Sequence, residues 1–166
     1  MSTNRPGGGR NAQDPPELQL VGPAESQKPP RKLSTRSKAR KRALDILFEA
    51  EIRRLSPIQV LTERDHDEVT PPVRVFTHEL VHGVEEHLDD IDDRIRAALA
   101  VGWTIERMPR IDRLMSRIAV FEIEYTDIHN SVAIAEAVAM VDDLSTDDSP
   151  PFVNGLLARI AETIGR

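Results

Sequence analysis

The sequence predicts an all-α protein, a single compact bundle of about seven helices, and three observations support this prediction. Apolar residues recur three and four positions apart through most of the chain after residue 36. Ser, Asp and Pro stand at the starts of these periodic segments, where helices are commonly capped, and polar loops separate them. No segment alternates apolar and polar residues with the period of two that is typical of a strand.

The first 35 residues are predicted to form a disordered, basic tail ahead of one helical domain at residues 36–166. Residues 1–33 hold six of the twelve prolines and four of the eight glycines, with few large apolar residues. A segment of this composition buries too little apolar surface to offset the entropy that ordering would cost.

The first helix is expected to begin at a cap on Ser34 or Thr35 and to run to about Leu55, where Ser56 and Pro57 stop it. A short second helix follows, with Ser56 as its cap and Pro57 in its first turn. The apolar side of the first helix is marked by residues at helical spacing: Leu44, Leu47, Phe48, Ile52 and Leu55.

Two helices are expected in the middle of the chain. The second of them begins with Asp89, Asp90, Asp92 and Asp93, which are expected to cap it and to favour the positive end of its dipole. Capping explains these carboxylates better than a cation site does. The first begins after two prolines and is apolar at helical spacing: Val73, Phe76, Leu80, Val84 and Leu88.

Three more helices are expected towards the C-terminus. The first of these begins near Pro109, and the second has Ser131 as its cap. The third has Asp148 or Ser149 as its cap and two prolines in its first turn. Gly155 in this last helix is expected to let a neighbouring helix approach closely.

Residues 78–82 spell HELVH, the HExxH pattern of zinc metalloproteases, in which two histidines bind the metal and the glutamate acts as base. On a helix turning about 100° per residue, His78 and His82 fall opposite the apolar residues, on the solvent side. A catalytic zinc also needs a third ligand and a walled cleft, and nothing in the pattern brings Glu106, a candidate by spacing, over this side. We interpret the motif as incidental, and we predict no metal, no cofactor and no catalytic residue.

The net charge of −6 is divided unevenly. Residues 1–42 carry +7, whereas the rest of the chain carries −13, and all four lysines lie at or before position 41. A basic arm on an acidic body indicates a polyanion as one partner and a cationic partner for the body. On composition alone, a solvated tail on an ordinary acidic domain remains an equal alternative.

Several classes of protein are excluded or disfavoured by composition. The absence of cysteine excludes disulfides, thiolate zinc sites and cysteine nucleophiles. No apolar run approaches the ~18 residues that a membrane helix needs, and the start of the chain lacks the apolar stretch of a signal peptide. We therefore expect a soluble, cytoplasmic protein without a membrane partner.

Three separated stretches resemble the NusB family of bacterial transcription antitermination factors. They are SKARKRALDILFEAE, RIDRLMSRIAVFEIEY followed by SVAIAEAVAMVDDL, and DDSPPFVNGLLARIA, in which FVNG-L is the most specific signature. The apolar stretch VFTHELVHGV also falls where the family has a helix ending in a similar Gly-Val. The resemblance covers about residues 36–165.

The resemblance implies an all-helical, non-enzymatic protein that binds boxA, a short single-stranded signal in ribosomal RNA leader transcripts. Members of the family act together with NusE, which is also a small-subunit ribosomal protein. The pair joins other Nus factors on elongating RNA polymerase and suppresses termination. Whether the chain also pairs with itself as a homodimer is left open.

The resemblance and the chemistry of RNA binding together predict eleven RNA-binding residues. Single-stranded RNA is held by cations on its phosphates and by planar groups stacked on its bases. Phe48 stands where the family commonly has tyrosine, and Pro151 where it often has a basic residue, so one hydrogen bond and one phosphate contact are expected to be missing. Core packing of Phe48, capping by Asp148 and a solvated helix face at Asp112 and Arg113 remain alternatives. The predicted residues are Arg36, Lys38, Arg40, Lys41, Arg42, Phe48, Asp112, Arg113, Asp148, Phe152 and Asn154.

Three other functions compete with this one. A similar helical domain occurs fused to ribosomal RNA cytosine methyltransferases, but this sequence has no α/β half for the cofactor and no cysteine. The zinc peptidase is disfavoured by the outward direction of its histidines. A helical protein-interaction module with weak or lost RNA binding is kept as the alternative, because of Phe48 and Pro151.

Overall fold

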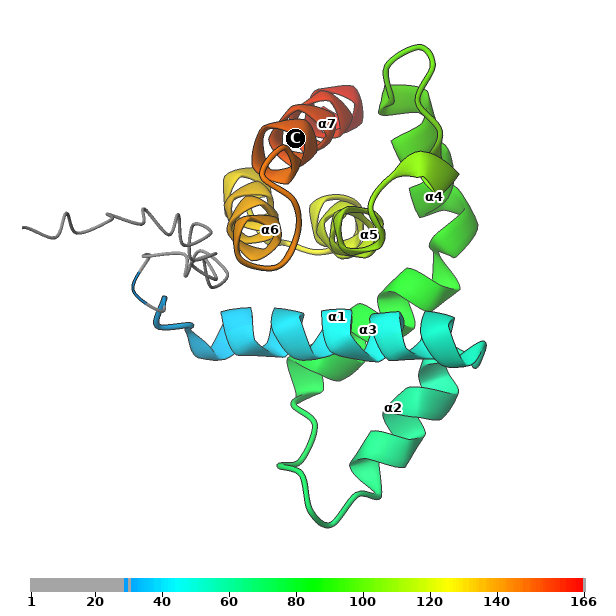
Figure 1. Cartoon of the computed structure of the whole chain (residues 1–166), viewed down its shortest axis with the longest axis vertical. Coiled ribbons are helices and arrows are strands. Elements are labelled where there is room, and N and C mark those ends of the chain that lie inside the picture. Colours follow the sequence, from blue (N-terminus) through cyan, green and yellow to red (C-terminus); the bar gives the residue numbers. More distant parts are fainter. Residues whose placement is uncertain (1–28, 30, 166) are drawn as a thin grey trace, which may run out of the picture. The chain divides into compact units, whose positions relative to one another are not determined.

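The computed structural model describes residue 29 and residues 31–165, and within them the chain forms seven α-helices and one short 3-10 helix (Figure 1). The prediction of an all-α bundle of about seven helices is confirmed. The helices are α1 (Thr35–Arg53), α2 (Pro57–Asp65), α3 (Val75–Glu86), α4 (Leu88–Ala98), α5 (Arg110–Tyr125), α6 (Asn130–Leu144) and α7 (Ser149–Ile164), and the 3-10 helix η1 (Ile105–Arg107) precedes α5.

The first two helices begin where the sequence predicts. Ser34 caps α1, and its side chain accepts a hydrogen bond from the backbone N–H of Ser37 at 3.1 Å. Ser56 caps α2, with Pro57 in the first helical position, where the missing N–H would have no helical partner. After the last turn of α1, Arg54 adopts the left-handed conformation with φ 56°, and its N–H bonds back to that turn.

Two caps differ from the prediction. His129, and not Ser131, precedes α6, and its Nδ1 accepts a hydrogen bond from the backbone N–H of Ser131 at 3.2 Å. His87 precedes α4, so the aspartates lie inside that helix. One of them, Asp92, is buried and pairs with Arg117 of α5 at 2.8 Å instead of capping.

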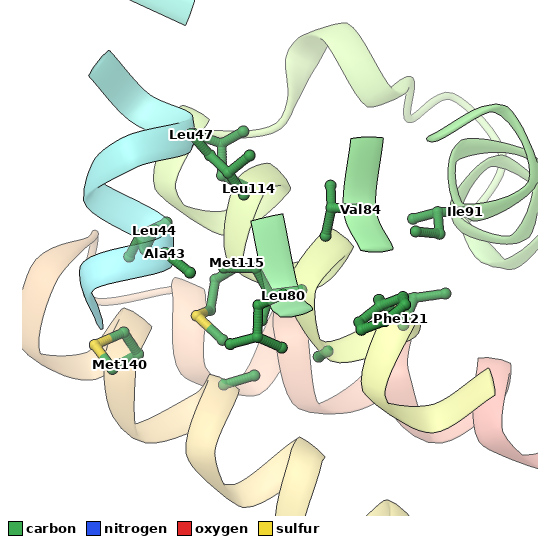
Figure 2. Packing of buried hydrophobic residues seen from close by; sticks show 14 of the residues in the cluster. Ala43, Leu44, Leu47, Leu80, Val84, Ile91, Leu114, Met115, Phe121 and Met140 are labelled. Atoms are coloured by element: carbon green, nitrogen blue, oxygen red, sulfur yellow. The ribbon is translucent and has the colours of Figure 1, made fainter. Parts of the chain in front are cut away.

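The fifth helix, α5, lies at the centre of the bundle and contacts α1, α3, α4, α6 and α7. Nearly every residue from 114 to 123 is buried, on all sides of the helix, which is typical of a helix that others enclose. Met115 and Phe121 of α5 belong to the same hydrophobic cluster as Leu80 of α3 and Leu44 of α1 (Figure 2). These five helices therefore present one face to α5 and the other away from it.

Helices α3 and α5 approach each other closely at Gly83 of α3. A Cβ atom placed on Gly83 would lie 2.1 Å from the ring of Phe121 on α5. The prediction of such a contact at Gly155 is wrong, because a Cβ there would meet only Arg159 Nη1, at an ordinary 3.5 Å.

The described residues from 33 to 165 belong to one compact unit. The predicted tail at residues 1–35 lies almost entirely outside the described residues, so the division into tail and helical domain stays a prediction. In the described part of the chain, no helix is both long enough and apolar enough to cross a membrane.

Candidate nucleic-acid interface

The basic half of α1 presents its cations on different sides of the helix. Lys38 is exposed, and Lys41 is half-exposed and pairs with Asp45 one turn later at 3.1 Å. Arg42 is partly buried on the same side, because positions 38, 41, 42 and 45 lie along one face of a helix. This face therefore combines three cations with a single carboxylate.

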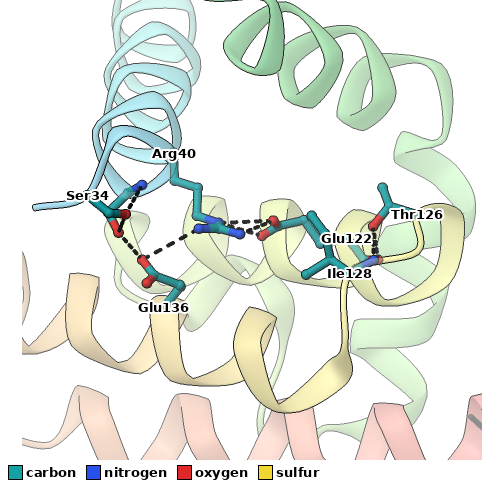
Figure 3. Close-up of polar contacts among 7 residues, drawn as sticks. Ser34, Arg40, Glu122, Thr126, Ile128 and Glu136 are labelled. Atoms are coloured by element: carbon teal, nitrogen blue, oxygen red, sulfur yellow. Dashed lines mark hydrogen bonds and ion pairs between the residues drawn. The ribbon is translucent and has the colours of Figure 1, made fainter.

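Arg40 points the opposite way, into the bundle, with only 2% of its surface exposed. Its Nε and Nη2 both donate to Oε1 of the fully buried Glu122 on α5, at 2.9 and 2.7 Å, and its Nη1 lies 3.7 Å from Oε2 of Glu136 on α6 (Figure 3). Ser37 adds a hydrogen bond from its hydroxyl to Glu136 at 2.7 Å. These contacts join α1 to α5 and α6. Arg40 could contact RNA only by leaving both carboxylates.

The ion pair of Arg40 and Glu122 offsets the cost of burying the glutamate carboxylate. Burial raises the pKa of the Glu122 carboxyl, and the Arg40 guanidinium opposes that rise through hydrogen bonds and charge. A buried ionised carboxylate is costly unless it is paired and fully hydrogen-bonded. Arg40 meets that requirement from a position 82 residues away in the sequence.

Arg36 remains at the surface beside an aromatic ring. Its guanidinium carbon lies 4.8 Å from the centre of the Phe76 ring on α3, and that of Arg40 lies 5.3 Å from the same ring. Arg36 is exposed and, like Lys38, has no ion pair within the described residues. These two side chains are thus the most accessible cations of the first turns.

Phe48 lies on α1 about three turns beyond Arg36 and Lys38. Its ring is partly buried against the core, and the guanidinium of Arg110, at the start of α5, lies 5.6 Å from its centre. Arg110 and Arg113 both pair with Glu51 of α1. Phe48 therefore packs against the core and also borders the surface, and Arg113 is held in an ion pair.

Asp112 is buried, with 1% of its surface exposed. Its two oxygens accept hydrogen bonds from the hydroxyls of Ser145 at 2.6 Å and Ser149 at 2.8 Å. The carboxylate thus fastens the start of α5 to the end of α6 and the start of α7. A contact between Asp112 and RNA would require these bonds to break.

The start of α7 places its three predicted residues near this junction. Asp148 occupies the N-cap position of the helix, as one of the two predicted caps, and it is exposed, but its side chain makes no capping hydrogen bond. Asn154 is exposed, and Phe152 is partly buried with its ring 5.5 Å from that of Trp103. Trp103 itself is 44% exposed. An aromatic pair therefore lies beside an exposed carboxylate and amide.

The two histidines and the glutamate of HELVH lie on the outer side of α3. His82 is exposed, and its ring lies nearly parallel to that of His78, with 6.2 Å between the two ring centres. The Nε2 atom of His78 lies 3.0 Å from Oδ1 of Asp65 on α2. Among the residues that the structure describes, no group of three or more His, Asp and Glu side chains is placed to bind a metal ion.

We expect the His82→Ala variant to unfold with a free energy within about 0.5 kcal/mol of the parent, as exposed substitutions usually do. Chemical denaturation measures it, and Leu80→Ala is the matched control: Leu80 lies two residues earlier on the buried side of the helix, and its truncation should cost about 2–5 kcal/mol. Metal analysis of the purified parent protein and of His82→Ala completes the test. A stoichiometric metal lost with His82 would contradict our interpretation of the motif.

Sequence reasoning missed several residues that shape this region. Glu122 and Glu136 bind Arg40, and the one available signal was a glutamate inside the otherwise apolar run IAVFEI. Arg110 follows the Pro109 that marks the start of α5. Trp103, the only tryptophan, stands in a loop without any helical pattern.

Comparison with known proteins adds sequence relatives. The family model described as "NusB family" matches residues 37–162. The transcription antitermination protein NusB of Thermobifida fusca is 48% identical over 133 residues, which cover 80% of this chain and 92% of that protein. That of Salinispora arenicola is 49% identical, covering 78% and 97%. The NusB of Cutibacterium acnes is 48% identical over 128 residues, and the chain spans about half of its length, 49%.

Solved structures share the fold. A structure of Thermotoga maritima NusB, described as "T. maritima NusB, P3121, Form 2", has 32% sequence identity and a TM-score of 0.68, covering 79% of this chain and 93% of that one. A structure of the antitermination factors NusB and NusE in complex with double-stranded RNA has 22% identity and a TM-score of 0.67, covering 77% and 96%. At that identity the second likeness concerns the fold alone.

Proposed function

Since the chain belongs to the NusB family, we propose that it is a non-enzymatic transcription antitermination factor that binds a boxA-type single-stranded RNA together with NusE. It acts in the cytoplasm on elongating RNA polymerase with other Nus factors. One observation of the structure supports this most directly. Most arginines after position 42 are held in ion pairs, whereas Arg36, Lys38 and Arg42 at the start of α1 pair with no carboxylate among the described residues.

Cations that lack a carboxylate are suited to phosphates. A strand of RNA that lies on them releases bound counterions, and this release makes binding strong at low salt. Arg36 and Lys38 are exposed and can make this contact. Arg40 supports the surface from inside, because its ion pair fixes the helix that presents them.

Bases require planar groups and hydrogen-bonding edges. Phe48 under Arg110 and Phe152 beside Trp103 each offer a ring at the border of the core. The exposed Asp148 accepts hydrogen bonds from base amino groups, and Asn154 both donates and accepts. Stacking supplies affinity for any base, and these two polar residues supply selectivity.

The acidic remainder suits a cationic protein partner. Residues after position 42 carry −13, which would speed the encounter with a basic ribosomal protein and help to orient it. The structural neighbour that contains both NusB and NusE supports this partner for the family fold.

We expect the double variant Arg36→Ala/Lys38→Ala to bind a boxA leader RNA about tenfold or more weakly, because two charge-assisted contacts are lost. The slope of log affinity against log salt should fall by about 1.4, at roughly 0.7 for each phosphate on a single strand. Fluorescence titration of labelled RNA at several salt concentrations, with and without NusE, measures both quantities.

The matched control is Arg53→Ala/Arg96→Ala, which removes the same charge from exposed ion pairs on α1's last turn and on α4. It should leave affinity and slope close to the parent. Equal losses in both variants would show that the first turns of α1 are not the RNA surface.

The alternative function, a helical interaction module with weak or lost RNA binding, rests on Phe48 and Pro151. Phe48 lacks a tyrosine hydroxyl, and the exposed Pro151 offers no cation before the FVNG signature. This alternative predicts NusE binding with no measurable RNA affinity in the same titration.

A further inference from the structure

A cationic pocket of about 180 Å³ lies between the first half of α1 and the segment that leads into α3. Figure 1 shows this segment rising to α3 beneath α1. Four cations line the pocket: Lys38, Lys41 and Arg42 from α1, and Arg74 from the start of α3. The one carboxylate in the lining, Asp45, already pairs with Lys41 at 3.1 Å. The pocket therefore has a strong excess of positive charge.

Arg42 has an incomplete set of hydrogen bonds in this pocket. Its Nη2 atom is buried and has no hydrogen-bond partner within the described part of the chain. A buried donor without an acceptor costs free energy, so a shift of the Arg42 side chain that brings Nη2 to an acceptor in the pocket removes that cost. A guanidinium favours a phosphate or carboxylate over a neutral acceptor.

The start of α3 adds a second source of positive potential. Arg74 occupies the cap position without a side-chain hydrogen bond, and the first turn of this 12-residue helix contains no acid. The first backbone bond of α3 runs from His78 N–H to the Arg74 carbonyl, and the structure shows no acceptor for the N–H groups of residues 75–77 within the described chain. Thr77 of this turn lines the pocket. Helix N-termini of this kind favour anions.

We propose that the cationic pocket binds a backbone phosphate of the RNA strand, with Arg42 and Arg74 as its principal contacts and Lys38 at the exposed side. This proposal rests on the proposed function and extends its surface from α1 to the segment before α3. A single strand lying on Arg36 and Lys38 would thus turn towards α3, and Arg74 becomes part of the interface.

The test uses the full chain and Arg74→Ala, because Arg74 is exposed and its truncation leaves the core intact. We expect a threefold to tenfold loss of affinity for boxA RNA, and a salt slope lowered by about 0.7. Arg74→Glu should lose more than Arg74→Ala, since it also repels the strand. Arg96→Ala on α4 is the matched control and should bind like the parent.

Two further arms separate this proposal from the function on which it rests. Arg36→Ala removes a cation outside the pocket: if it weakens binding while Arg74→Ala and Arg74→Glu do not, the pocket is overturned and the RNA function stands. If none of the three variants changes affinity, the pocket and the RNA-binding function both fail.

Inorganic phosphate is titrated at constant ionic strength with the amide signals of residues 75–77 as the readout. Shifts caused by phosphate but not by RNA would also overturn the pocket as an RNA site.

Discussion

Replacing Arg40 with Met is expected to lower the free energy of unfolding by about 3–5 kcal/mol, the cost usual for a buried ion pair that loses one member. The substitution leaves the Glu122 carboxylate inside the bundle without its two strong donors. It also removes the link from α1 to Glu136 on α6. Equilibrium denaturation in urea measures the loss.

The control for this variant is Arg36→Met, which removes the neighbouring cation over the same Phe76 ring but leaves the buried pair intact. It should change stability by less than about 0.5 kcal/mol, as exposed substitutions do. The double variant Arg40→Met/Glu122→Leu should recover much of the loss, because an apolar pair needs no compensation. A single variant as stable as the parent would contradict a structural role for Arg40.

The pH dependence supplies an independent check. Burial already raises the pKa of Glu122 above the usual 4.5, and loss of Arg40 should raise it further. A carboxyl whose pKa is higher in the folded state binds more protons there than in the unfolded state. The free energy of unfolding therefore falls as pH rises above the pKa that the group has in the unfolded state. The loss in free energy of unfolding caused by Arg40→Met should therefore grow as pH rises above about 4.5, and it should become smaller as pH falls towards 4.5.

The helices were predictable because their signals are local. Ser34, Ser56 and Pro57 mark starts through bonds within a few residues, and the apolar spacing marks the faces. The caps at His87 and His129 were missed because histidine is not among the residues that usually cap helices, while a more usual residue stood close by.

The functional surface was only partly predictable. Counting charges does not distinguish the five cations at the start of α1. Arg40 is nevertheless buried by partners on α5 and α6, and no local sequence pattern reveals these partners. Asp112 is similarly bound to Ser145 and Ser149, 33 and 37 residues away. Arg74 was overlooked because it stands alone in its segment, and only the fold brings it next to Arg42. The eleven RNA contacts themselves stay a prediction.

Replacing Gly83 with Val is the second change with a large expected effect, a loss of about 3 kcal/mol or more in the free energy of unfolding. Even the Cβ atom of alanine would lie 2.1 Å from the Phe121 ring, which is far inside van der Waals contact. Phe121 is itself confined, with its ring 6.2 Å from that of His87 and 5.9 Å from that of Tyr125. The ring can move only by disturbing that stack or by separating α3 from α5.

The matched control is Gly155→Ala in α7, where a Cβ finds open space apart from Arg159 Nη1 at 3.5 Å. It should raise stability by up to about 1 kcal/mol, because alanine favours a helix more than glycine does. The double variant Gly83→Ala/Phe121→Leu should be more stable than Gly83→Ala alone, since the smaller side chain relieves the clash. Tolerance of Gly83→Val would mean that α3 and α5 separate freely. A loss of stability in Gly83→Val would instead show that α3, the helix that contains HELVH, is held against α5 by packing at the residue after His82.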